Sequence, residues 1–338
     1  MHIDTALDIE DHFSAAYIIQ QAQQAEALGY HALWTRETKH DPFLPLLLAA
    51  EHTTRLQLGT GIAVAFARSP MALAQVAWGI QRLSQGRFIL GLGTQVKAHI
   101  ERRFGMVWDH PAPRLRDYIL ALRAIWHCWQ TGGPLNFRGQ FFKLTLMSPF
   151  FNPGPLEHPQ IPIYIAGVNE HLCQLAGELC EGFHVHPLHT PKYLAEFIWP
   201  NLEKGLQKSG RAWKEMTTVS SAFVIAGDTQ AERDAMRGRV RQQISFYAST
   251  PSYYPVFAIH GWQRIAEQLS SLAARGKWDE MPPLITDEML AVFAPEGTWA
   301  EMPVLLSKRY QGMLDRVTYY FEPLTVEQQR MAVADFPA

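Results

Sequence analysis

The amino-acid sequence predicts an α/β protein built as a closed (β/α)₈ barrel, with eight parallel strands alternating with helices. Two apolar runs, residues 56–66 and 87–94, are rich in branched residues and end in small ones, a pattern typical of strands buried on both faces. The helical segment 70–83 lies between them and completes a strand, helix, parallel strand unit. The alternation continues along the 338 residues without an internal linker, which favours a closed barrel over an open sheet.

Six further segments have the apolar composition of strands. The first is a short run at the start of the chain, the second follows Gly29, and the fifth follows Pro162. In chain order, the expected strands are residues 1–6, 30–36, 56–66, 87–94, 163–166, 182–186, 218–226 and 316–321.

The helices between these strands are indicated by periodicity and by signals at their ends. Residues 12–28 place Ile18, Ala22 and Ala25 at helical spacing and stop at Gly29. Thr229-Gln-Ala-Glu232 has the spacing of a capping box, which opens a helix after the seventh strand. The other expected helices are residues 42–52, 70–83, 114–129 and one that begins near Asn169 or Glu170.

We expect residues 1–338 to form a single barrel domain with two insertions. The first, about residues 95–162, follows strand four and includes the helix 114–129 and a hairpin near Arg138-Gly139. The second, about residues 249–313, follows strand seven and is rich in aromatic residues: Tyr253, Tyr254, Trp262, Trp278 and Trp299. Because barrel enzymes vary function through such loops, both insertions are candidates for substrate walls. Packing or dimer surface is an equally good interpretation.

Composition and charge exclude several classes of protein. The 30 basic and 32 acidic side chains give a net charge of -2, so the basic excess of nucleic-acid-binding proteins is missing. No run of 18 apolar residues spans a membrane, and the first ten residues lack the pattern of a signal peptide. Cys128, Cys173 and Cys180 make no disulfide framework. We therefore expect a soluble cytoplasmic protein, with neither nucleic acid nor membrane as a partner.

Small residues stand where three expected strands emerge at the carboxyl end of the barrel, where such barrels have their active sites. In residues 59–62, a glycine in mid-strand allows a bulge that supports the face of a planar ring. Tight packing of a helix on the strand is the alternative. Residues 91–94 lack the third glycine of a dinucleotide fingerprint, which excludes a Rossmann site, but leave Gly93 and the Thr94 hydroxyl available to a ligand. Residues 165–169 end a strand and open a helix, whose free amides suit a phosphate; a packing glycine is the alternative.

An acid and an imidazole, Glu37 and His40, follow strand two at the expected mouth of the barrel. They are candidates for proton donor and acceptor. The alternative is a solvated loop in which Asp41 caps the helix after Pro42.

His184 and His186 form a second candidate pair. A spacing of two places both imidazoles on one face of a strand, as in the metal pairs of barrel hydrolases. No lysine ends strand four, and Glu322 rather than aspartate follows strand eight. Histidines at the polar end of a pocket are therefore the favoured interpretation, and no metal site is expected.

Taken in order, several short motifs resemble the bacterial luciferase-like flavin and deazaflavin oxidoreductases, and among them the coenzyme F420-dependent group. Two of the motifs are Leu58-Gly-Thr-Gly-Ile62 and Leu90-Gly-Leu-Gly-Thr94. Each motif is short, and their order and spacing together are specific to the superfamily. The full set covers most of the chain: residues 27–34, 58–62, 68–70, 84–87, 90–94, 114–118, 162–167 and 175–182.

The resemblance implies a luciferase-like TIM barrel with the ring of F420, or alternatively FMN, at its carboxyl-terminal mouth. The Gly61-Ile62 bond matches a position where the family often has a non-prolyl cis peptide. Relatives often carry an acid followed directly by histidine after strand two; here Thr38 follows Glu37, so that His40, or else His99, His184 or His186, would supply the imidazole. The cofactor contacts implied by the resemblance are Gly61, Ile62, Gly93, Thr94, His99, Ala166, Gly167 and Val168.

The function expected on this basis is F420-dependent hydride transfer to or from a small, largely apolar organic substrate. A luciferase-like monooxygenase that uses reduced FMN is the first alternative. A metal-dependent barrel hydrolase based on His184 and His186, and a non-catalytic flavoprotein, are the others. The resemblance also implies a homodimer.

Overall fold

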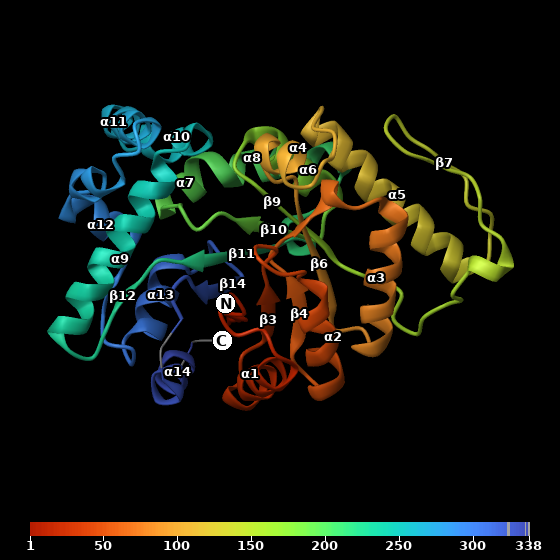
Figure 1. Ribbon diagram of the computed structural model, residues 1–338, viewed down its shortest axis with the longest axis horizontal. Helices are drawn as coiled ribbons and strands as arrows, with labels where there is room; N and C mark the ends of the chain where they lie inside the picture. The colour runs from red at the N-terminus through yellow and green to blue at the C-terminus, as the bar shows by residue number, and fades with distance from the viewer. Residues whose placement is uncertain (323–324, 335, 337–338) are drawn as a thin grey trace.

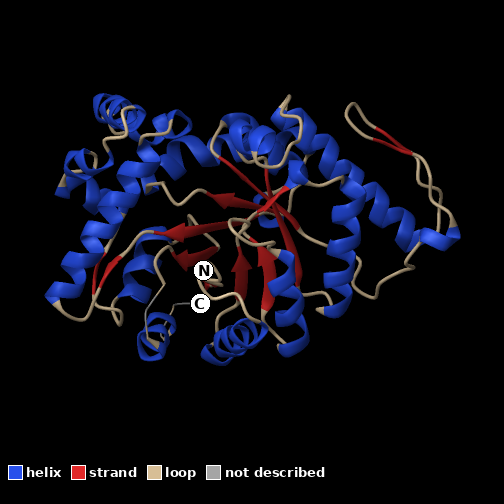
Figure 2. Ribbon diagram, viewed as in Figure 1, coloured by secondary structure: helices blue, strands red, loops and turns tan. Residues whose placement is uncertain are grey.

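Eight parallel strand positions close into a barrel in the computed structural model, which describes residues 1–322, 325–334 and 336. The hydrogen-bonded order is β1-β14-β11-β10-β9-β6-β4-β3-β2, and β1 and β2 are successive parts of the first strand, so the sheet returns to its start. Figures 1 and 2 show the strands in the centre with the helices around them. The barrel strands are β1 (His2–Ile3), β2 (Thr5–Ala6), β3 (Ala32–Thr35), β4 (Gln57–Thr60), β6 (Phe88–Gly93), β9 (Ile163–Gly167), β10 (Gly182–Val185), β11 (Thr217–Ala222) and β14 (Arg316–Tyr319). The expected fold class is confirmed.

Most of the expected strands are shorter than predicted by one to three residues, and three of them are interrupted or end at least four residues early. Strand one is divided at Asp4, strand three ends at Thr60, and strand seven ends at Ala222. After strand three, β5 (Ala63–Val64) pairs with β6 again and a short helical turn, Ala65–Ala67, follows. After strand seven, β12 (Ile225–Ala226) leaves the barrel and pairs with β13 (Glu296–Gly297). An apolar run indicates only that a segment is buried. A buried segment outside the barrel has the same composition as a barrel strand, so the run does not show where the strand ends.

Capping residues mark the ends of several helices. Ser14 accepts a hydrogen bond from the Tyr17 amide at the start of α1 (Ala15–Leu28), and Gly29 ends that helix in the left-handed region at φ 91°. Thr229 forms the expected capping box with Glu232. The other longer helices are α2 (Phe43–His52), α3 (Pro70–Leu83), α5 (Pro111–Thr131), α6 (Glu170–Leu179), α8 (Trp199–Ser209), α9 (Gln230–Ala248), α13 (Met302–Tyr310) and α14 (Val326–Val333).

The two regions expected as insertions hold most of the remaining structure. In the first, the antiparallel strands β7 (Phe137–Arg138) and β8 (Lys143–Leu144) confirm the hairpin, and their segment extends away from the barrel at the right of Figure 1. The helix α5 in this region packs between α3 and α6 in the outer layer of the barrel. The remaining α-helices are α4 (Lys97–Arg102), α7 (Pro191–Tyr193), α10 (Tyr254–Ala258), α11 (Gln263–Ala274) and α12 (Asp287–Phe293).

A separate cluster of buried side chains fills the inside of the barrel: Ala32, Trp34, Ile89, Tyr164 and Val219. Glycine makes room for the largest of them, because a Cβ on Gly59 would lie 2.2 Å from Trp34 Cζ3. Gly59 therefore packs against a side chain of the neighbouring strand rather than against a helix. Below this layer, Arg316 donates to both carboxylate oxygens of Asp4, at 2.7 and 2.9 Å.

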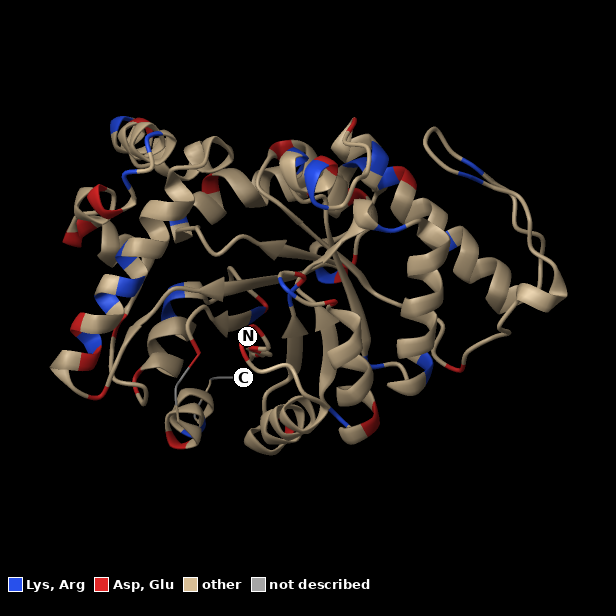
Figure 3. Ribbon diagram, in the orientation of Figure 1, with Lys and Arg blue, Asp and Glu red and all other residues tan. Residues whose placement is uncertain are grey.

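Charged residues of both signs are mixed over the outer helices and loops (Figure 3). None of the described helices is both long enough and apolar enough to cross a membrane.

The three cysteines should not react with a thiol reagent in the folded protein. All three are buried and unpaired, and burial raises the pKa of each thiol, that of Cys173 to about 12. Because the thiolate is the nucleophile, neutral pH and burial both suppress the reaction. Titration with dithionitrobenzoate should detect no thiol in native protein and three in denaturant, whereas rapid reaction of native protein would contradict the burial.

Candidate functional site

A cavity of about 590 Å³ opens at the carboxyl end of the barrel strands. Seven of the residues expected to contact a cofactor line it: Gly61, Ile62, Gly93, Thr94, Ala166, Gly167 and Val168. They come from the ends of β4, β6 and β9, and so from three neighbouring strands of the barrel. The structure therefore brings together the small residues that the sequence singled out.

The chain after β4 runs close to β6. Thr60 Oγ1 donates to the Gly91 carbonyl at 2.6 Å and accepts from the Gly91 amide at 2.9 Å. A Cβ on Gly91 would lie 1.8 Å from the Thr60 carbonyl oxygen, so only glycine allows this approach. The next peptide bond, Gly61-Ile62, is cis, as the family resemblance implies. A Cβ on Gly61 would be in ordinary contact, at 3.6 Å, with Trp34 and His184.

Gly167 is required by packing and also lines the cavity. A Cβ at this position would lie 2.4 Å from Leu172 Cβ, in the first turn of α6. Asn169 caps that helix, since its side chain accepts from the Leu172 amide at 3.0 Å. A packing role for Gly167 is therefore compatible with a role of this strand end in binding a ligand.

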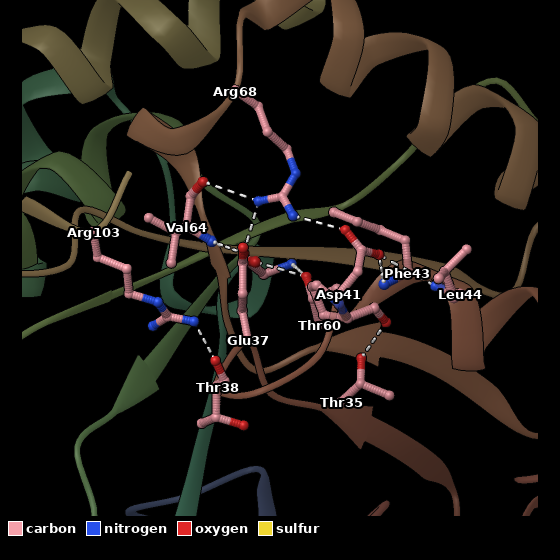
Figure 4. Close-up of polar contacts among 12 residues, drawn as sticks. Thr35, Glu37, Thr38, Asp41, Phe43, Leu44, Thr60, Val64, Arg68 and Arg103 are labelled. Atoms are coloured by element: carbon pink, nitrogen blue, oxygen red, sulfur yellow. Dashed lines mark hydrogen bonds and ion pairs between the residues drawn. The ribbon is translucent and has the colours of Figure 1, made fainter. Parts of the chain in front are cut away.

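Glu37 and His40 lie outside the cavity lining. Glu37 Oε2 accepts from Arg68 Nη1 and from the Val64 amide, both at 2.7 Å, and Arg68 also binds Asp41 at 2.8 Å (Figure 4). The Glu37 amide donates to the Ile62 carbonyl at 3.2 Å, so this residue holds the segment after β4 in place. His40 stacks on Phe13 with ring centroids 4.2 Å apart. Their catalytic role stays a prediction.

His99, on α4, is also outside the lining, although Lys97 of the same helix belongs to it. No described hydrogen bond joins the His99 side chain to a residue of the cavity. Its role as a cofactor contact stays a prediction.

His184, on β10, and His186, one residue past the end of that strand, both line the cavity, as their spacing predicted. His184 meets the Trp34 ring edge-on, with centroids 4.9 Å apart, and its buried Nε2 has no partner among the described residues. Burial, with the Arg316 cation nearby, lowers the pKa of His184 to about 3. Among the described residues no three His, Cys, Asp or Glu side chains form a group that could bind a metal ion.

His186 is held between aromatic rings. Its Nδ1 accepts from the Leu188 amide at 3.1 Å, and its Nε2 lies 2.9 Å from Tyr253 Oη. It stacks on Tyr253, with centroids 4.3 Å apart, and meets Tyr247 edge-on at 4.7 Å. Burial lowers the pKa of His186 to about 3. The ring is therefore neutral at physiological pH.

Some lining residues were not singled out from the sequence, although one signal marks them. Inward-facing residues of a strand alternate, and three further pairs with the same spacing of two as His184 and His186 line the cavity: Trp34 with Arg36, Val219 with Ser221, and Thr318 with Tyr320. Of the aromatic residues expected to form a substrate wall, Tyr253 lines the cavity, whereas its neighbour Tyr254 is 37% exposed.

The folded protein should lose stability as the pH falls from about 6.5 to about 4. His184, His186 and His189 are buried, and burial lowers the pKa of each, to about 3, 3 and 4. Below pH 6.5 the unfolded chain takes up these protons and the folded chain does not, so the slope reaches about 1.4 kcal/mol per pH unit for each histidine. When urea unfolding is measured between pH 7 and pH 4, the free energy of unfolding should fall less steeply with pH for His189→Gln than for the wild type. Equal slopes would contradict the burial of a neutral imidazole.

The family model described as luciferase-like monooxygenase matches residues 2–315. The chain belongs to this family. An uncharacterised protein of Mycobacterium tuberculosis is 45% identical over 311 residues, 92% of each chain. The 5,10-methylenetetrahydromethanopterin reductase of Archaeoglobus fulgidus is 28% identical over 276 residues, which cover 79% of this chain and 78% of the reductase.

Two solved structures have the same fold. The coenzyme F420-dependent tetrahydromethanopterin reductase of Methanopyrus kandleri aligns with a TM-score of 0.79 at 19% identity, over 98% of this chain and 97% of the reductase. The FMN complex of a Baeyer-Villiger monooxygenase component from Pseudomonas putida aligns with a TM-score of 0.70 at 14% identity, over 99% and 97%. The predicted family and the enzyme class, a luciferase-like oxidoreductase, are thereby confirmed.

Proposed function

We propose that this protein is an F420-dependent oxidoreductase that transfers a hydride to or from a small, largely apolar organic substrate in the cavity at the barrel mouth. The observation that carries the proposal is the cavity itself. One side of it is backbone and small side chains at Gly61, Gly93 and Ala166, and another side is aromatic. Its volume falls in the usual range for pockets that bind small molecules and cofactors.

The lining fits a flat, tricyclic ring. Gly61 and Gly93 expose backbone on one wall, so a planar ligand can approach closely there. The His184 ring lies at the depth of Gly61, with its Cε1 atom 3.6 Å from the position that a Cβ on Gly61 would take. When bound, the deazaflavin supplies or accepts the hydride, and this chain orients the ring and excludes water. Its phosphate-bearing side chain would reach the rim, where Arg36 and Lys97 provide positive charge.

FMN is the second candidate, because an FMN-binding monooxygenase component shares the fold. The M. kandleri reductase is F420-dependent by name. So is a glucose-6-phosphate dehydrogenase of Nakamurella multipartita, which is 26% identical over 234 residues. This support favours F420 for the present chain. With reduced FMN, the reaction would be an oxygen-dependent monooxygenation.

We also propose that the protein is a single barrel domain that forms a homodimer through α2 and α3. These helices pack against one another and carry exposed apolar side chains: Leu44, Leu47, Val76 and Leu83, which are 38–55% exposed. Light scattering should give twice the chain mass of 38.4 kDa; a monomer would contradict the proposal.

The reaction is tested by incubating the protein anaerobically with reduced F420 and a panel of ketones, and aerobically with reduced FMN. Oxidation of F420 that depends on both protein and ketone supports the proposal. Substrate-dependent oxygen uptake with FMN alone would assign a monooxygenase instead. Tight binding of a cofactor that no compound oxidises or reduces would support a non-catalytic flavoprotein.

A further inference from the structure

The atoms around Tyr253 and His186 determine which of the two side chains donates the hydrogen bond between them. The Leu188 amide donates to His186 Nδ1. Because an amide nitrogen can only donate, Nδ1 carries no proton, and the neutral imidazole carries its proton on Nε2. Nε2 lies 2.9 Å from Tyr253 Oη. The imidazole therefore donates and the phenol oxygen accepts.

The phenol proton of Tyr253 is thus available to another acceptor. Within the described part of the chain, Tyr253 Oη has no hydrogen bond other than that to His186. Stacking on His186 and edge contact with Tyr247 fix the ring, and both His186 and Tyr253 line the cavity. Burial raises the pKa of Tyr253 to about 12, so the group is protonated, and a donor, at neutral pH.

Other hydroxyl groups of the cavity are engaged differently. Ser220 donates to the Val185 carbonyl at 3.1 Å, and Thr94 donates to the Gln95 carbonyl at 3.2 Å. Within the pairs Ser221–Thr318 and Tyr247–Tyr320, each 2.6 Å apart, either oxygen can be the donor. Tyr253 differs from these groups because its described partner can only donate to it.

The charge of the lining limits the ligand that this donor can bind. Among the described lining residues, the charged side chains are Arg36 and Lys97, and both are exposed at the rim. The interior has neutral imidazoles, hydroxyl groups and the aromatic rings of Tyr247, Tyr253 and Tyr320. An ionised group placed there would lose its hydration without gaining a counter-ion.

The position of Tyr253 along the barrel also favours a substrate contact. Gly61 lies at the level of His184, and His186 is two residues further along the chain, just past the end of β10, which in extended chain is about 6.6 Å toward the mouth. Tyr253 stacks on His186 and so lies above the level of Gly61, where the flat ring would rest.

We propose that Tyr253 is a substrate-binding residue that donates a hydrogen bond to a single acceptor oxygen, such as a ketone carbonyl, on a neutral and largely apolar compound. This inference rests on the proposed function, because it treats the cavity as the substrate site. It adds the ligand class and the atom that recognises it.

The test compares two probes that differ in one atom group, acetophenone and α-methylstyrene, in which a methylene group replaces the carbonyl oxygen. Dissociation constants are measured by ligand-observed NMR for the full-length wild type, for Tyr253→Phe and for the control Tyr254→Phe. Loss of one neutral hydrogen bond corresponds to about a three- to tenfold weaker affinity. We expect that loss for acetophenone with Tyr253→Phe only. Affinity for α-methylstyrene should be the same in all three proteins, which also shows that the cavity is intact.

Equal affinity of acetophenone for the wild type and Tyr253→Phe would overturn the inference, as would failure of both probes to bind the wild type. The same variants are titrated with F420. An F420 affinity that Tyr253→Phe leaves unchanged places the acceptor on the substrate, whereas weaker F420 binding would mean that Tyr253 serves the cofactor and would also overturn the inference. The wild type could bind acetophenone more tightly than Tyr253→Phe does and yet bind no F420. In that case the proposed function fails and the assignment of Tyr253 stands.

Discussion

Replacing Asp4 with alanine should destabilise the folded protein by about 3–5 kcal/mol, because it leaves a buried guanidinium without its counter-ion. Arg316 is 6% exposed and Asp4 is fully buried. Asp4 accepts two hydrogen bonds from Arg316 and one, at 2.9 Å, from the Trp34 indole. These three residues come from strands one, two and eight, where the barrel closes. The carboxylate therefore joins the first and last strands.

Urea denaturation followed by circular dichroism measures this loss. Asp287→Asn is the matched control, since Asp287 pairs with Arg241 but is 85% exposed, and its change should be within about 0.5 kcal/mol. The double variant Asp4→Leu, Arg316→Met should recover much of the loss, because it removes both buried charges. An Asp4→Ala variant as stable as the control would contradict the role of this pair.

Gly61→Val should weaken F420 binding by about 10- to 100-fold while the barrel still folds. The Cβ position of residue 61 is already in contact with Trp34 and His184, so the two added methyl groups have room only on the cavity side. Forcing a ligand against such groups costs roughly 1–3 kcal/mol, which corresponds to this change in affinity.

Gly61→Ala is the control for Gly61→Val. Its single methyl group is at ordinary contact distance, 3.6 Å from its neighbours, so we expect close to wild-type affinity for F420. The two variants and the wild type are compared by fluorescence titration, with thermal unfolding to confirm folding. A folded Gly61→Val variant with undiminished affinity would place the cofactor elsewhere.

Much of the barrel can be predicted from the sequence because burial and capping leave local signals. All eight strand positions appear as apolar runs, α1 ends at Gly29 as predicted, and α9 begins after the predicted cap Thr229. The break in strand one and the early ends of strands three and seven have no such local signal in the sequence. At Ala222, for example, the chain leaves the barrel for β13 while remaining buried, and burial is all that an apolar run reports.

The backbone side of the candidate site is predictable for the same reason, since the small residues at Gly61, Gly93 and Gly167 mark strand ends. The role of Glu37 is not, because its partner Arg68 is 31 residues away and reaches it only in the folded chain. The contact of His186 with Tyr253 joins residues 67 positions apart. Contacts of this kind depend on how the loops fold over the barrel.

The most direct test of the central claim is a fluorescence titration of purified, cofactor-free protein with oxidised F420 and, separately, with FMN. The account predicts saturable, tight binding of F420 that exceeds the affinity for FMN. Tight binding of FMN alone would contradict the deazaflavin assignment and favour a flavin monooxygenase. Binding of neither by folded protein would contradict the assignment of the cavity as a flavin site.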